Sequence, residues 1–220
     1  MPLLLARQSP VLGIWKITEL WQDMLELFTD KALFADDVRL IQSDKRKQEW
    51  LAVRLLVKYL TSSEIPVRYR ENGAPFLATF QLHISISHTK GYAAVILNGN
   101  PRPGIDIEYR SERAWKLRKR FMNENELQMI TLLNNTNQSV DGSALYKQIT
   151  LATLCWCAKE TVYKSLQETG VDFINHLHIV PFSLSEKGSF SLKETKTNQQ
   201  KTYLIHYQTN EDFIITWTNG

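Results

Sequence analysis

One arrangement occurs twice along this chain of 220 residues: helical stretches, followed by several short runs with the alternation of β-strands. In the first half, helix is predicted over 36–60, and strand-like runs follow at 67–70, 76–78, 82–87 and 91–97. In the second half, a helix from about 144 to 167 precedes runs at 176–181, 189–193, 202–207 and 213–218. Helices followed by short antiparallel strands, twice over, predict an α+β fold with two lobes of similar size.

A dense group of turn-forming residues separates the two halves. The segment Asn98-Gly99-Asn100-Pro101-Arg102-Pro103 combines two prolines with a glycine and two asparagines. Such segments interrupt regular structure and mark linkers. We therefore predict an N-terminal lobe at 1–103 and a C-terminal lobe at 104–220.

Charge and cysteine usage narrow the class of protein. A net charge of +3 indicates mild attraction to anions such as phosphates, nucleic acid or an acidic protein, without choosing among them. The only cysteines, Cys155 and Cys157, point in different directions from a predicted helix, so neither a disulfide nor a metal clip is expected. Reduced thiols favour a cytoplasmic protein. The apolar patch Leu3–Leu5 is too short for a signal sequence or a membrane span.

Three acidic residues on two predicted elements are candidates for a metal site. Asp106 and Glu108 alternate on a strand that starts after Gly104, so their carboxylates point to one face. Trp156, Glu160 and Lys164 follow at intervals of four residues and share one stripe of a helix. Taken alone, Asp106 and Glu108 could be a solvated strand face, and Glu160 and Lys164 could be a surface ion pair. Together they indicate an oxygen-rich pocket of the kind that holds Mg²⁺ beside a phosphate ligand.

Other polar residues lie upstream of this pair of elements. Ser87 and His88 end a half-buried strand, where a histidine can contact a phosphate, carry a proton or simply bond to backbone. The turn at Asn72-Gly73 lies beside basic strand residues and is also a candidate for backbone contact with a ligand. The basic run Lys45–Lys47 is either a solvated helix face or a phosphate anchor.

Taken in order, these segments resemble the 4′-phosphopantetheinyl transferase superfamily. The monomeric, two-lobed type is the more similar one, since the chain has about twice the length of the short trimeric carrier-protein synthases. The motifs are Asn72-Gly73-Ala74-Pro75-Phe76, Ile84-Ser85-Ile86-Ser87-His88-Thr89, Gly104-Ile105-Asp106-Ile107-Glu108, Phe121 with Glu124, and Trp156-Cys157-Ala158-Lys159-Glu160-Thr161-Val162-Tyr163-Lys164.

The resemblance implies a fold and an activity. The fold is two pseudo-symmetric α+β lobes with coenzyme A in the cleft between them. The enzyme, a holo-[carrier protein] synthase, moves the 4′-phosphopantetheine arm of coenzyme A onto a serine of an acyl or peptidyl carrier protein and releases adenosine 3′,5′-bisphosphate. The reaction depends on Mg²⁺. A cytoplasmic monomer is implied, with no nucleic-acid or membrane partner.

The resemblance also implies roles for individual residues. Asp106, Glu108 and Glu160 would hold Mg²⁺ against the pyrophosphate. The catalytic residues would be Glu160, Lys164 and His88, with Lys164 neutralising the leaving phosphate and Glu160, or a water on the metal, accepting the serine proton. The residues predicted to contact coenzyme A are Arg46, Arg70, Gly73, Ser87, His88, Asp106, Lys159 and Lys164.

Some residues depart from the family pattern, and two other interpretations remain open. Ala74 stands where the family often has lysine, and Arg68 or Arg70 is a candidate to replace that phosphate contact. The basic residues at 113–120 would steer an acidic carrier protein toward the site. The alternatives are a nucleic-acid-binding domain that uses 45–47 and 110–120, and a degenerate transferase that binds coenzyme A without turnover.

Overall fold

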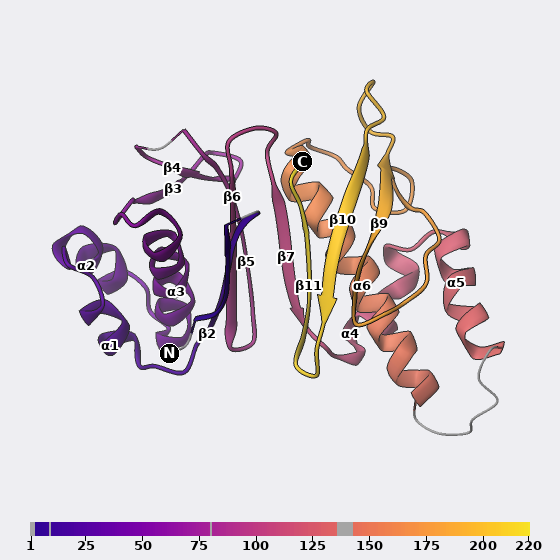
Figure 1. Cartoon of the computed structure of the whole chain (residues 1–220), viewed down its shortest axis with the longest axis horizontal. Helices are drawn as coiled ribbons and strands as arrows, with labels where there is room; N and C mark the ends of the chain where they lie inside the picture. The colour runs from indigo at the N-terminus through magenta and orange to yellow at the C-terminus, as the bar shows by residue number, and fades with distance from the viewer. Residues whose placement is uncertain (1–2, 9, 80, 136–142) are drawn as a thin grey trace. The chain divides into compact units, whose positions relative to one another are not determined.

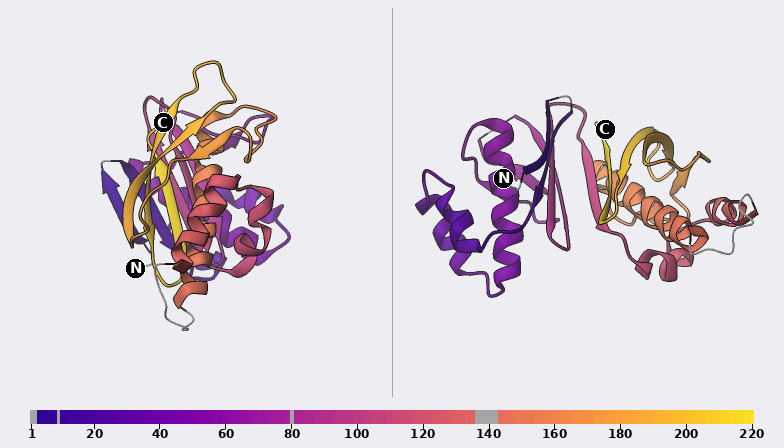
Figure 2. Two further views of the ribbon diagram at one scale, coloured as in Figure 1. Left: turned by 90° about the vertical axis from the view of Figure 1, so that its right-hand side faces the viewer. Right: turned by 60° about the horizontal axis from the view of Figure 1, so that its bottom comes forward.

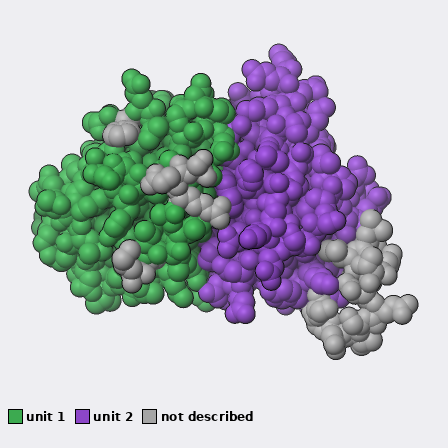
Figure 3. Space-filling view, viewed as in Figure 1, with its two compact units in different colours: residues 1–105, 219 green, residues 106–218, 220 purple. Residues whose placement is uncertain are grey.

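The computed structural model describes residues 3–8, 10–79, 81–135 and 143–220. The chain forms two compact units: residues 1–105 with residue 219, and residues 106–218 with residue 220 (Figure 3). The division falls inside a strand, whereas the sequence places it after residue 103. Each unit combines helices with antiparallel strand pairs, which confirms the predicted α+β class.

Unit 1 contains a four-stranded sheet in the order β1-β2-β6-β5. Its strands are β1 (Leu3–Gln8), β2 (Val11–Lys16), β5 (His83–Thr89) and β6 (Tyr92–Asn98), and every adjacent pair is antiparallel. A separate hairpin is formed by β3 (Val67–Tyr69) and β4 (Pro75–Leu77). The apolar patch Leu3–Leu5 belongs to edge strand β1, which the sequence analysis did not predict.

The helices of unit 1 are α1 (Trp21–Glu26), α2 (Ala32–Arg39) and α3 (Asp44–Thr61). Figures 1 and 2 show α3 between the sheet on one side and α1 and α2 on the other. The prediction of one helix over 36–60 is wrong, because a new helix starts where the side chain of Ser43 accepts a hydrogen bond from the Arg46 N–H. Gly13 lets α3 approach the sheet, since a Cβ there would lie 2.8 Å from Leu56 Cδ2.

Unit 2 contains a five-stranded sheet in the order β7-β11-β10-β9-β8. Its strands are β7 (Gly104–Tyr109), β8 (Leu177–Ile179), β9 (Lys187–Glu194), β10 (Thr202–Thr209) and β11 (Phe213–Thr218). Its helices are α4 (Glu112–Leu117), followed by a 3₁₀ turn (Arg118–Arg120), α5 (Glu124–Asn135) and α6 (Ser143–Leu166). No described helix is both long enough and apolar enough to cross a bilayer.

Helix α6 runs through the core of unit 2, against the sheet on one side and near α4 and α5 on the other (Figures 1 and 2). Thr161 on its sheet side donates a hydrogen bond to the backbone carbonyl of Thr216 in β11. A capping box starts α5, because Asn123 and Glu126 exchange hydrogen bonds of 2.9 and 3.0 Å. Packing on both sides fixes the rotation of α6 about its axis.

Candidate functional site

Strand β7 and helix α6 bring the predicted acidic residues together. Ile105 and Ile107 of β7 are completely buried, and the alternation of the strand turns Asp106 and Glu108 to the other face. The ammonium of Lys164 donates a 2.7 Å hydrogen bond to Asp106 Oδ1. The indole N–H of Trp156 donates a 3.1 Å hydrogen bond to Glu108 Oε1. Two contacts, eight residues apart on α6, therefore fasten the helix to the strand.

Glu160 lies on α6 midway between these two contacts. Burial raises the pKa of Glu160 to about 7, and the negative charges of Asp106 and Glu108 add to that effect although Lys164 opposes it. The pKa of Glu108 is also raised, first by burial and then by Asp106. The three carboxylates are therefore close enough to repel one another, and Lys164 alone does not neutralise them.

The negative charge of these carboxylates also affects the pKa values of two neighbours on α6, Lys164 and Cys157. Burial disfavours the ammonium of Lys164, but Asp106 and Glu160 outweigh burial and raise its pKa, so Lys164 stays protonated. Cys157 is buried on the same helix, and burial together with Asp106 and Glu108 raises the pKa of its thiol well above the usual value. Cys157 is therefore an inert thiol and not a nucleophile.

The carboxylates of Asp106, Glu108 and Glu160 are chemically suited to bind a divalent cation. Carboxylate oxygens are the ligands that Mg²⁺ prefers, and a cluster with surplus negative charge is stabilised by a cation. Among the described residues, no group of three His, Cys, Asp or Glu side chains is arranged so that it could hold a metal ion. In the structure, the positive partner of Asp106 is Lys164.

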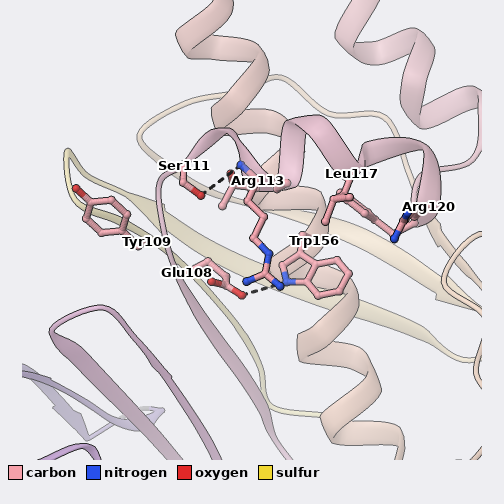
Figure 4. Close-up of a pocket in the computed structure, with 10 residues that line it drawn as sticks. Glu108, Tyr109, Ser111, Arg113, Leu117, Arg120 and Trp156 are labelled. Carbon is pink, nitrogen blue, oxygen red and sulfur yellow. Dashed lines mark hydrogen bonds between the residues drawn. The ribbon is translucent and has the colours of Figure 1, made fainter. Parts of the chain in front are cut away.

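A cavity of 410 Å³ adjoins Glu108 and Trp156 (Figure 4). Its other lining residues come from the end of β7, from α4 and the following turn, and from α6: Tyr109, Ser111, Arg113, Ala114, Leu117, Arg120, Phe121 and Thr153. In Figure 4 the guanidinium of Arg113 points toward the hydrogen bond between Glu108 and Trp156. The lining of the cavity thus combines apolar side chains with the carboxylate of Glu108 and the guanidinium groups of Arg113 and Arg120.

A second polar cluster lies within unit 1, at the start of α3 and the end of β5. Arg46 Nη1 lies 2.6 Å from His88 Nε2 and donates a 3.3 Å hydrogen bond to Glu49 Oε2. His88 Nδ1 is 3.6 Å from the same carboxylate oxygen, and Lys45 Nζ is 3.8 Å from the other one. The side chain of Glu49 is only 9% exposed, so a nearly buried carboxylate contacts the three basic side chains.

The remaining predicted coenzyme contacts of unit 1 fall in different places. Gly73 has φ +79°, which suits glycine in the turn between β3 and β4. Ser87 is buried in β5. Arg70 lines a cavity together with His83 and Arg102.

Lys159 is completely buried in unit 2. Its ammonium donates three hydrogen bonds of 2.7 Å each, to the carboxylate of Glu126 and to the backbone carbonyls of Phe121 and Phe173. All three donors of the ammonium are used, so none is left for a ligand. The geometry does not support the prediction that Lys159 contacts coenzyme A.

Sequence reasoning missed two residues that the structure places beside the predicted ones. Glu49 follows Arg46 by three positions and Lys45 by four, and this helical spacing could have indicated that its carboxylate lies beside them. Arg113 was noted only as part of a basic stretch. Its position near Glu108 depends on how α4 packs against α6, which no local pattern predicts.

The family model described as the 4′-phosphopantetheinyl transferase superfamily matches residues 102–218, which is more than half of the chain. The match covers both the strand with Asp106 and Glu108 and the helix with Glu160 and Lys164. No curated protein matches the chain.

Proposed function

Because the chain belongs to the 4′-phosphopantetheinyl transferase superfamily, we propose that it transfers the phosphopantetheine arm of coenzyme A to a carrier-protein serine. The reaction would require Mg²⁺ and release adenosine 3′,5′-bisphosphate. One observation carries the proposal: α6 sets Glu160 and Lys164 against the two carboxylates of β7.

The residues that would hold Mg²⁺ are Asp106, Glu108 and Glu160. Burial and then the negative charge of Asp106 raise the pKa values of Glu108 and Glu160, and a cation at this position would stabilise the ionised carboxylates. When bound, Mg²⁺ supplies neutralisation of the negative charge on phosphate oxygens.

The side chains of this cluster provide the proton transfers. The serine hydroxyl attacks the phosphorus that carries the pantetheine arm, and a carboxylate oxygen of Glu160 accepts its proton. Proton transfer to a positioned carboxylate of this kind contributes about 10²- to 10⁴-fold to the rate. The bond from that phosphorus to the leaving adenosine bisphosphate breaks, and the Lys164 ammonium stabilises or protonates the leaving oxygen.

On unit 1, Arg46, Ser87 and His88 are the proposed contacts of the coenzyme phosphates. Arg46 presents a planar guanidinium that can bind phosphate with two hydrogen bonds, and its side chain is 52% exposed. His88 lies beside it and can donate a further hydrogen bond or carry a proton. Arg70 and the backbone at Gly73 complete the predicted set.

The carrier protein would dock on the basic segment that follows β7. Arg113, Lys116, Lys119 and Arg120 are exposed there, and Arg118 is half-buried over the ring of Trp115. Carrier proteins of this class are typically acidic, so the two surfaces are complementary in charge. Such complementarity raises the rate of association and orients the partner.

The test is mass spectrometry of an apo carrier protein after incubation with the full chain, coenzyme A and Mg²⁺. The proposal predicts a gain in mass equal to one phosphopantetheinyl group, and none with Asp106→Ala or Glu160→Ala. Glu168→Ala is the matched control, because Glu168 is an exposed carboxylate just beyond α6. Coenzyme A binding without any mass gain would indicate a degenerate transferase. Salt-sensitive nucleic-acid affinity without loading would indicate the nucleic-acid-binding alternative.

A further inference from the structure

The buried lysine of α6 contacts the backbone of two phenylalanines from different segments. The ammonium of Lys159 donates 2.7 Å hydrogen bonds to the carbonyl of Phe121, just after the 3₁₀ turn, and to that of Phe173, between α6 and β8. Its third hydrogen bond goes to the buried carboxylate of Glu126. Because one ammonium bonds all three acceptors, the backbones of both phenylalanines are held in place against α6.

The side chains of the same two phenylalanines contact the indole of Trp156. The ring of Phe121 meets the indole edge-on, with 5.1 Å between the ring centroids. The ring of Phe173 is tilted against the indole, with 5.5 Å between the centroids. Lys159 follows Trp156 by three positions on α6, so the two residues are neighbours on the helix surface. The lysine therefore holds the backbones whose rings pack on the indole.

A hydrogen-bonded turn fixes the backbone around Phe173. Asp172 Oδ1 accepts 2.8 Å hydrogen bonds from the N–H groups of Ile174 and Asn175. The backbone carbonyl of Asp172 accepts a 2.9 Å hydrogen bond from the N–H of His176. None of these bonds involves the ring of Phe173. A substitution that removes the ring therefore keeps both the turn and the carbonyl that accepts the lysine.

The indole of Trp156 also holds one of the proposed metal ligands. Its N–H donates the 3.1 Å hydrogen bond to Glu108 Oε1, beside the 410 Å³ cavity (Figure 4). A glutamate side chain can adopt several rotamers, and this bond favours one orientation of the carboxylate. Hydrogen bonds to the ligands of a metal orient them and strengthen its binding. The orientation of Glu108 therefore depends on the position of the indole.

We propose that Phe173 is a positioning residue for Glu108: its ring holds the indole of Trp156, and the indole N–H orients the carboxylate toward the cation. Lys159 supports this arrangement from the interior through the backbones of Phe121 and Phe173. The role of the cation rests on the proposed function, whereas the link from Phe173 to Glu108 rests on contacts within unit 2. Lys159 thus contributes to the site although its ammonium contacts no ligand.

The first measurement is hydrogen exchange of the Trp156 indole N–H, followed by NMR of the full chain without metal or coenzyme A. Trp156→Phe identifies the signal by its loss. Phe173→Leu removes the ring but keeps an apolar side chain, and we expect the indole N–H to exchange about tenfold faster because an aromatic contact is lost. Glu108→Ala should also speed the exchange, because it removes the acceptor.

The second measurement is the Mg²⁺ dependence of carrier-protein loading. Phe173→Leu should raise the Mg²⁺ concentration for half-maximal loading about tenfold, because Glu108 is then less well oriented. At saturating Mg²⁺, kcat should stay near the wild-type value. A general loss of folded protein would lower the rate at every Mg²⁺ concentration, so the two quantities distinguish positioning from stability.

The matched control is Phe182→Leu. Phe182 is another partly buried phenylalanine of unit 2, and its ring contacts Phe190 and Tyr207. Its replacement should leave both the exchange of the Trp156 indole and the Mg²⁺ requirement unchanged. Circular dichroism checks that each variant is folded.

Four results would overturn the proposal. They are wild-type indole exchange in Phe173→Leu, wild-type exchange in Glu108→Ala, equally fast exchange in Phe182→Leu and Phe173→Leu, and an unchanged Mg²⁺ requirement in an active Phe173→Leu enzyme. A wild-type chain that loads no carrier protein would contradict the proposed function instead. The exchange measurement needs no activity, so it would still decide whether Phe173 and Trp156 position Glu108.

Discussion

The ammonium of Lys164 lies 2.7 Å from Oδ1 of Asp106, and this contact joins the end of α6 to the middle of β7. The Asp106 side chain is only 5% exposed, whereas that of Lys164 is 26% exposed. Lys164 is therefore the member of the pair that can also reach a ligand. A charge pair of this kind holds a cation ready beside the cluster before any substrate binds.

Replacing Glu160 by Gln should reduce the rate of carrier-protein loading. The amide keeps the size of the side chain but cannot accept the serine proton, so we expect kcat to fall by about 10²- to 10⁴-fold. Steady-state kinetics of loading measures the effect. Glu168→Gln serves as the control, and a Glu160→Gln enzyme with wild-type kcat would contradict the assigned role.

Replacing Glu49 by Gln should weaken coenzyme A binding more than it slows the chemical step. Glu49 contacts no reacting atom in our proposal, but its carboxylate holds both Arg46 and His88. We expect KM for coenzyme A to rise about tenfold, since a charge-assisted hydrogen bond contributes on the order of 1.5–3 kcal/mol. Kinetics at varied coenzyme A concentration separates KM from kcat.

Asp44→Asn is the matched control for Glu49→Gln. Asp44 is another carboxylate of α3, paired with Lys47 and 73% exposed. Its loss should leave KM for coenzyme A unchanged. A fall in kcat with constant KM in Glu49→Gln would show that Glu49 does not position the coenzyme contacts.

Replacing Lys159 by Met should destabilise the protein strongly. The change leaves the buried carboxylate of Glu126 without its cation, and breaking a buried pair costs about 3–5 kcal/mol. Urea denaturation followed by circular dichroism measures the free energy of unfolding. The exposed Lys119 provides the control Lys119→Met, which should change it by less than about 0.5 kcal/mol.

A double variant checks the cause of that loss. Adding Glu126→Gln to Lys159→Met removes the uncompensated charge, so the double variant should lose less stability than the sum of the single ones. Strict additivity would mean that the two groups are not energetically coupled.

Stability should depend on pH through Glu64. Partial burial opposes ionisation of this carboxyl, but the hydrogen bonds from Lys58 and from the backbone N–H groups of Thr29 and Asp30 outweigh it and lower its pKa to about 2. A lowered pKa in the folded state gives stability that is present above the unfolded value of 4.5 and is lost as the pH falls toward 2.

Thermal unfolding between pH 7 and pH 2 measures this dependence in the wild type and in Glu64→Gln. The wild type should lose an extra amount on the order of 1–2 kcal/mol across the range from pH 4.5 to pH 2, after allowance for solvent screening. Identical pH profiles of the two proteins would exclude Glu64 as the source.

Strand and helix periodicity was enough to predict each half of the carboxylate cluster, on the strand and on the helix. Alternation alone puts Asp106 and Glu108 on one face, and a spacing of four puts Glu160 and Lys164 on one stripe. The same periodicity could not separate Lys159 from Glu160, because the role of Lys159 depends on Glu126 in another helix. Local pattern describes a face of an element but not what packs against it.

The cavity of unit 1 shows the same limit. Arg70, His83 and Arg102 come from three segments that are adjacent only in the folded chain. The sequence analysis linked Arg70 to coenzyme A through its position near the Gly73 turn. It did not predict that Arg70 shares a cavity with His83 and Arg102.

Neighbouring residues 159 and 160 of α6 point about 100° apart around the helix axis and contact different parts of unit 2. Lys159 anchors the helix to the interior, and Glu160 faces the carboxylates of β7. A rotation that moved Glu160 away from that cluster would also pull the ammonium out of its three acceptors. Activity and the folded structure should therefore be lost together on heating, without a folded but inactive species between them.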